Sequence, residues 1–277
     1  MARVILSGLF CAFFLTGCFS GDFQPTYKEG DISDNIKKIC LDEYKLDVSC
    51  IRAGGTLWVY APQPRILHAE FGKNPDKIFD DGIIDRARNI LTSISRVMLS
   101  CDKSPDFFVL VLSDVKLGLD YSFTVNSLDI KKSASGVIPW NEANKRYVVN
   151  FVRAPEAVGD MTGAHLKPYD IKMPEFITLQ IAQRVKMFFQ NEAVKGYLVL
   201  KEANVGFQDN DFIVEYSVSV VSEPPEEINV EAGILDIIVY CFKTYEFSDF
   251  SRVRIKDIQS GRGGAYEKRD ILSRTIA

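Results

Sequence analysis

The chain has 277 residues, of which 47% are hydrophobic and 25% are charged, and its formal net charge is −4. This composition is ordinary for a globular protein, and the length suits one large domain or two small ones that need neither metals nor disulfides to bury a core. The acidic balance argues against a nucleic-acid-binding protein.

The N-terminus has the pattern of an export signal. A basic start, Met1 to Arg3, precedes an apolar stretch from Val4 to Leu15, which is too short to span a ~30 Å bilayer core comfortably. The tetrapeptide Leu15-Thr16-Gly17-Cys18 follows and resembles the lipobox of bacterial lipoproteins. The resemblance implies a diacylglycerol on the sulfur of Cys18 and cleavage before it by signal peptidase II. A cleaved signal without lipid and an uncleaved anchor are the alternatives.

The lipobox divides the start of the chain into a signal peptide, residues 1–17, and a polar tether, residues 18–31. Residue 19 is Phe and not Asp, which in a Gram-negative cell favours the outer over the inner membrane. No later apolar run is long enough to span a bilayer, so we expect a folded part attached to the membrane by lipid.

The following segments alternate between helical and strand patterns. Periodic apolar positions predict helices from Ser33 to Tyr44, Ile83 to Cys101, Pro174 to Gln190, and from about Glu223–Glu226 to Tyr245. Short β-type runs predict strands at residues 48–51, 56–60, 107–112, 197–200, 212–221 and 253–258, with looser alternation over 119–130. The run Phe107–Leu112 is continuously apolar, which predicts a strand buried on both faces.

These elements predict an α+β fold, with a mixed or antiparallel sheet and about three main helices packed on it. A weak similarity between residues 37–51 and 238–255, each a helix, a tyrosine, an aspartate and a strand, leaves two related halves as an alternative. We expect the folded part to cover residues 32–258, with a sub-boundary in the Pro- and Gly-rich stretch 154–174. Residues 259–277 read as a basic flexible tail.

Cysteines and histidines offer little chemistry. Beyond Cys11 and Cys18 the chain has Cys40, Cys50, Cys101 and Cys241, which are predicted mainly as buried thiols, with at least one disulfide as the alternative. Their spacing matches no zinc-ligand pattern, and no metal or cofactor is predicted.

One polar cluster stands out as a candidate ligand-binding site: Asp160, His165 and Asp170. Such a loop could bind a cation or a sugar, or could simply connect two elements at the surface. The sequence contains no motif of a metalloprotease, an α/β-hydrolase or a phosphate-binding loop.

The sequence therefore predicts an envelope lipoprotein, tethered by lipid at Cys18, that binds or scaffolds another envelope protein or a wall polymer without catalysis. The alternative is a lipoprotein hydrolase that uses Asp and Glu on cell-wall or polysaccharide substrates, because such chemistry leaves no linear motif.

Overall fold

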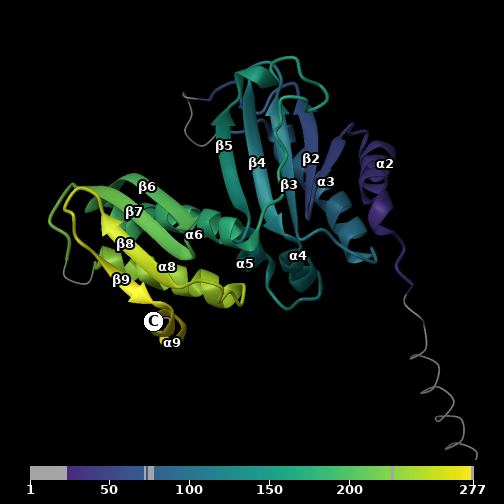
Figure 1. The fold of residues 1–277 in the computed structure, drawn as a ribbon. Coiled ribbons are helices and arrows are strands. Elements are labelled where there is room, and N and C mark those ends of the chain that lie inside the picture. Colours follow the sequence, from purple (N-terminus) through teal and green to yellow (C-terminus); the bar gives the residue numbers. More distant parts are fainter. Residues whose placement is uncertain (1–23, 72, 74–77, 226–227, 276–277) are drawn as a thin grey trace, which may run out of the picture.

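The computed structural model describes residues 24–71, 73, 78–225 and 228–275. Two mixed β-sheets, one of five strands and one of four, lie side by side with helix α6 between them (Figure 1). This arrangement confirms the α+β class. No helix within the described ranges is long and apolar enough to cross a membrane.

The first half of the chain builds the five-stranded sheet. Its elements are η1 (Glu29–Asp31), α2 (Ile32–Tyr44), β1 (Ser49–Ala53), β2 (Thr56–Gln63), α3 (Asp81–Leu99), β3 (Phe107–Asp114), β4 (Leu119–Asn126), α4 (Ser127–Ala134), α5 (Trp140–Lys145) and β5 (Val148–Arg153). The strands are ordered β1-β2-β3-β4-β5, and only β2 and β3 pair in parallel.

The second half builds the four-stranded sheet. Its elements are η2 (Pro155–Ala157), α6 (Met173–Gln190), α7 (Glu192–Lys195), β6 (Leu198–Gln208), β7 (Asp211–Val220), α8 (Val230–Thr244), β8 (Arg252–Asp257), β9 (Gly263–Glu267) and α9 (Lys268–Ser273). The order is β6-β7-β8-β9, with β7 and β8 parallel and the outer pairs antiparallel.

Both halves share one topology. A helix and a hairpin are followed by a second helix and a second hairpin, and the two hairpins join through a central parallel pair, first β2 with β3 and then β7 with β8. The similarity noted in the sequence pairs α2 with α8, which are the first helix of one half and the second helix of the other. The topology instead matches α2 with α6 and α3 with α8.

Strand β3 shows how the first half is packed. All eight of its residues are buried. Phe108, Leu110 and Leu112 join the core under α2 and α3, whereas Phe107, Val109 and Val111 join a second core on the opposite face of the sheet. This two-sided burial confirms the strand predicted from its continuous apolar run.

The boundaries of three predicted segments differ from the structure. Helix α8 begins at Val230 because Asn229, and not the Pro-rich stretch before it, caps the helix by accepting a hydrogen bond from the amide of Ala232 (3.0 Å). The later part of the predicted tether is folded: Tyr27 donates its amide to the carbonyl of Ser100 (3.1 Å) at the end of α3. The tail prediction is also wrong, because β9 pairs with β8, and Ile271 of α9 is 1% exposed.

A buried polar network joins the two halves. Arg146 donates to Asp129 (2.9 Å) within the first half, and the side chain of Asp129 is only 2% exposed. From α8 and its end, the hydroxyl of Tyr245 donates to Asp129 (3.0 Å) and that of Tyr240 donates to Glu142. Burial raises the pKa of Asp129, while the bonds from Arg146 and Tyr245 oppose that shift.

Candidate functional site

Residues 154–172 link β5 to α6 and cross the face of the first sheet that faces away from α2 and α3 (Figure 1). Hydrogen bonds from β2 hold this segment along its length. The hydroxyl of Tyr60 donates to the carbonyl of Asp160 (2.5 Å), and the indole of Trp58 donates to the carbonyl of Tyr169 (3.1 Å). The segment is therefore tied to the sheet, although the sequence leaves open a loose surface connection.

The loop that follows Asp160 is organised by that carboxylate. Its oxygens accept hydrogen bonds from the amides of Thr162 (2.8 Å), Gly163 (2.9 Å) and His165 (2.9 Å). Gly163 has a φ of +82°, and a Cβ there would lie 2.8 Å from the ring of Tyr60. Only glycine fits this close approach.

His165 lies between two carboxylates. Its Nδ1 is 2.7 Å from Asp160, and its Nε2 is 3.0 Å from Asp120 on β4. Asp120 also accepts a hydrogen bond from the hydroxyl of Ser113 (2.5 Å). The side chains of His165, Asp120 and Asp160 are 6%, 10% and 11% exposed, so the cluster is largely closed to solvent.

The two carboxylates shift the titration of the ring. Burial disfavours the charged imidazolium, but the hydrogen bonds and charges of Asp160 and Asp120 outweigh it and raise the pKa of His165. Burial likewise opposes ionisation of Asp160, but its bonds to His165 and Thr162 hold the pKa of that carboxyl well below its ordinary value. With both nitrogens occupied, His165 is not placed to act as a general base.

Asp170, the third predicted residue, serves a separate purpose. It accepts a hydrogen bond from the amide of Gly55 (2.8 Å) in the β1–β2 turn and pairs with Lys172. The hydrogen bond from Lys172, followed by that from Gly55, lowers the pKa of Asp170. The structure therefore joins Asp160 and His165, places Asp170 at the other end of β2, and adds Asp120.

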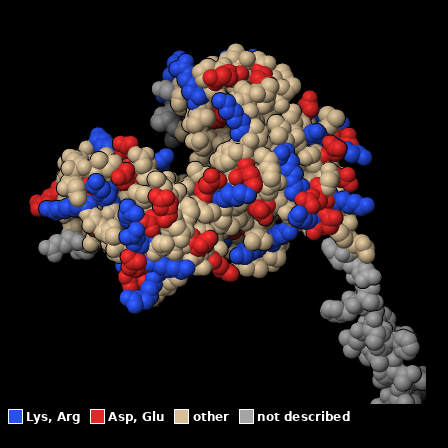
Figure 2. Space-filling view, in the orientation of Figure 1, with Lys and Arg blue, Asp and Glu red and all other residues tan. Residues whose placement is uncertain are grey.

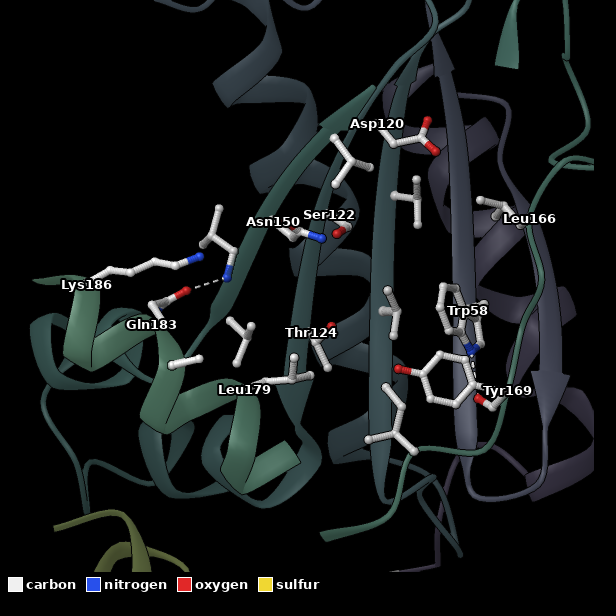
Figure 3. Close-up of a pocket in the computed structure, with 17 residues that line it drawn as sticks. Trp58, Asp120, Ser122, Thr124, Asn150, Leu166, Tyr169, Leu179, Gln183 and Lys186 are labelled. Carbon is white, nitrogen blue, oxygen red and sulfur yellow. Dashed lines mark hydrogen bonds between the residues drawn. The ribbon is translucent and has the colours of Figure 1, made fainter. Parts of the chain in front are cut away.

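Beside this cluster an open cleft of about 410 Å³ lies between the first sheet, the crossing segment and α6 (Figure 3). Trp58 and Tyr169 line one side with their rings 5.6 Å apart, and Ser122 and Asn150 line the sheet. Asp120 is the single carboxylate among the described residues that line the cleft. Most glycosidases use a pair of carboxylates on opposite sides of the scissile bond, and the described lining of this cleft contains no such pair.

A second hollow, of about 590 Å³, lies on the opposite face of the same sheet. We call it the α3 groove. Its walls come from α3 and α4, with Ile84, Leu91, Leu99 and Ile130 among them, and its floor includes Tyr121, Phe123 and Val149 from β4 and β5. Its lining is thus mostly apolar. The sequence feature that could have predicted this apolar floor is the alternation of apolar and polar residues over 119–126. Tyr121 and Phe123 share one face of β4, and Asp120 and Ser122 share the other.

The remaining predicted sites add no chemistry. Cys40, Cys50, Cys101 and Cys241 are free thiols, and Cys40 and Cys241 are buried. The part of the chain that the structure describes has no group of three or more His, Cys, Asp or Glu side chains that could hold a metal ion. Cys18, the predicted lipid attachment site, lies outside the described residues.

No protein family model matches the chain, and neither a curated protein nor a solved structure is significantly similar to it.

Proposed function

We propose that the chain is a bacterial envelope lipoprotein, tethered by lipid at Cys18, whose folded part binds another envelope component without catalysis. The α3 groove carries the binding part of this proposal. Monomeric proteins seldom leave a large contiguous apolar hollow open to water, and where they do it is commonly a binding surface.

The cleft on the opposite face argues against the hydrolase alternative. Both nitrogens of His165 are bonded to carboxylates, and both oxygens of Asp120 are engaged, with Ser113 and His165. These groups hold the crossing segment on the sheet and leave no free acid–base pair directed at a ligand.

The membrane part of the proposal rests on the lipobox and on where the folded part begins. Tyr27 is already fixed to the end of α3. The six residues from 18 to 23 span at most about 20 Å when fully extended. A lipid on Cys18 would therefore keep the folded part close to the bilayer surface, and in a Gram-negative cell the outer membrane is favoured.

Substitution of the lipobox cysteine tests the anchor. Wild-type protein should incorporate a palmitate analogue and fractionate with membranes, whereas Cys18→Ser should incorporate none and accumulate as uncleaved precursor. Cys11→Ser is the matched control, because it changes the other cysteine of the leader and should label like the wild type. Equal labelling of Cys18→Ser and wild type would disprove lipidation at this residue.

The same wild-type preparation, incubated with purified cell-wall sacculi and polysaccharides, should release no soluble fragments by chromatography. Release by wild-type protein that disappears in Asp120→Asn would establish the hydrolase alternative instead.

A further inference from the structure

The helix layer on the first sheet is incomplete. Helices α2 and α3 pack on β1 to β3 through buried residues such as Ile36, Ile90 and Leu110. On the same face, Phe123 of β4 lies opposite Val149 of β5, and Tyr121 lies opposite Phe151. Val149 and Phe151 remain 41% and 43% exposed. Two strands of this face therefore lack the helix that the neighbouring strands have.

The dimensions of the uncovered strip match one helix. Neighbouring strands are about 4.8 Å apart, so β4 and β5 form a strip roughly 10 Å wide. A helix with its side chains is about 10–12 Å across and packs about 8–10 Å from its neighbour. At one end α4 closes the strip, and at the other Phe79 stacks on Tyr121 with ring centres 4.8 Å apart. From Tyr121 to the end of β4 at Asn126 the strip is about 17 Å long, which accommodates about three turns of helix.

The charge of the α3 groove indicates the chemistry of its occupant. Arg88 and Arg96 line it, and no Asp or Glu is among its described lining residues. Their partners, Asp85 and Glu43, form exposed ion pairs, which contribute little to stability and can be exchanged for others. An occupant with acidic side chains along its edge would complement both arginines.

We propose that a partner protein binds the α3 groove through a single amphipathic α-helix, with its apolar face on Phe123, Val149 and Leu99 and its acidic edge against Arg88 and Arg96. This proposal names the partner class for the binding role proposed above and rests on it. A bilayer surface is the poorer fit, because the apolar floor is recessed between α3 and α4 and a flat surface would not reach it.

Two synthetic helical peptides of equal length test the proposal, each with the same leucine face but with either Glu or Lys along the edge. Binding is measured by fluorescence anisotropy to the full chain in zwitterionic detergent micelles, which dissolve the chain with or without lipid, and empty micelles are the blank. The Glu peptide should bind at least tenfold more tightly than the Lys peptide, and Arg88→Glu with Arg96→Glu should reverse that preference.

Val149→Glu and Val152→Glu form a matched pair on one strand. The two valines are 41% and 42% exposed and point to opposite faces of the sheet, since Val149 lies opposite Phe123 and Val152 lies opposite Asp120. Val149 lines the α3 groove and also reaches the cleft, where its backbone amide donates to Gln183 (2.7 Å), whereas Val152 lines the cleft alone. Val149→Glu should weaken binding of the Glu peptide at least tenfold, and Val152→Glu should leave it unchanged. Circular dichroism melts show whether each variant is folded, and at such exposed positions both should be.

Absence of binding by either peptide, equal binding of both, or equal losses in the two valine variants would overturn the proposal. Tighter binding of wild-type protein than of Val149→Glu to phosphatidylglycerol vesicles, with neither peptide bound, would assign the groove to the membrane instead. None of these measurements depends on lipid attachment, so failure here is distinct from failure of the lipoprotein assignment.

Discussion

The imidazole of His165 links a strand to the loop that crosses it. A neutral histidine can donate from only one ring nitrogen, so two carboxylate partners favour the doubly protonated ring. Asp120 is fixed on β4 and Asp160 is fixed by its loop, and the ring between them joins the crossing segment to the sheet.

His165→Gln should lower the free energy of unfolding by about 3 kcal/mol near pH 5.5, because two largely buried carboxylates lose their cation. The raised pKa of His165 sets the pH dependence. The protonated ring stabilises the fold fully below the ordinary value of 6.5, and this contribution is lost as the pH rises through the folded-state pKa. Urea denaturation at pH 5.5 and at pH 9 should therefore show a smaller difference between wild type and variant at the higher pH.

His68→Gln is the control, since it removes the only other histidine in the chain. It should leave this pH-dependent difference intact. A constant difference between wild type and His165→Gln across the pH range would mean that the ring is neutral in the fold.

Closeness in the sequence predicts that Asp160 and His165 lie together, but it does not predict Asp120, the third residue of the cluster. Asp120 is 45 residues from His165 and is brought to it only when the loop crosses β4. Asp170, close in sequence, points to a different turn. Ser93 is a similar case: the helical period places it outside the apolar stripe, yet it is buried and donates to the carbonyl of Asn89 (3.0 Å).

Among the elements, β5 and β9 are the strands absent from the sequence prediction, for different reasons. The run Val148–Arg153 has valine or phenylalanine on both faces, so it lacks the alternation that marks a half-buried strand, and five of its six residues are in fact exposed. Strand β9 is short and begins Gly263-Gly264, a composition typical of a loop. Its formation depends on the backbone of β8 as a partner, which local sequence does not encode.

The C-terminal helix α9 completes the second core. Ile271 is 1% exposed within that core, and the neighbouring Leu272 is 41% exposed. Ile271→Ala should lower the free energy of unfolding by about 2–4 kcal/mol, because it leaves a cavity under α8 and β8.

Leu272→Ala, the exposed neighbour, should change stability by about 0.5 kcal/mol or less. Chemical denaturation of both variants gives the comparison. Equal small effects would restore the reading of residues 259–277 as a flexible tail.

The whole molecule consists of two halves that repeat one topology and are joined by the buried polar network. The composition and element order predict the α+β class, but not that the helices divide between two sheets, because strand pairing is set by contacts distant in sequence. The Pro- and Gly-rich stretch predicted as a sub-boundary, residues 154–174, falls between β5 and the body of α6, where the topology repeats.

The double variant Tyr240→Phe with Tyr245→Phe should uncouple the halves, since it removes the hydroxyl bonds from α8 to Glu142 and Asp129 without leaving an unpaired cation. Each such bond to a charged group is worth about 1.5–3 kcal/mol. Both tryptophans, Trp58 and Trp140, lie in the first half, so their fluorescence reports that half while far-ultraviolet circular dichroism reports both.

In the wild type the two signals should change at the same denaturant concentration, and in the double variant their midpoints should separate. Tyr266→Phe removes a comparable bond to Glu231 (2.6 Å) within the second half and should not separate them. Coincident midpoints in the double variant would show that apolar packing alone couples the halves.

The pairing of Tyr27 with the end of α3 has a mechanical consequence for a tethered protein. If the chain is anchored at Cys18 as proposed, a pull on the anchor would first load the two hydrogen bonds that join Tyr27 to Ser100 (3.1 Å) and Asp102 (3.0 Å). Glu29 holds the same segment through its ion pair with Arg52 (2.6 Å), and if residues 24–31 detached as a whole, the tether would gain at most about 27 Å while α2 and both sheets stay folded. With the proposed anchor, this detachment would let the folded part move farther from the bilayer under load, and the same hydrogen bonds would re-form when the tension falls.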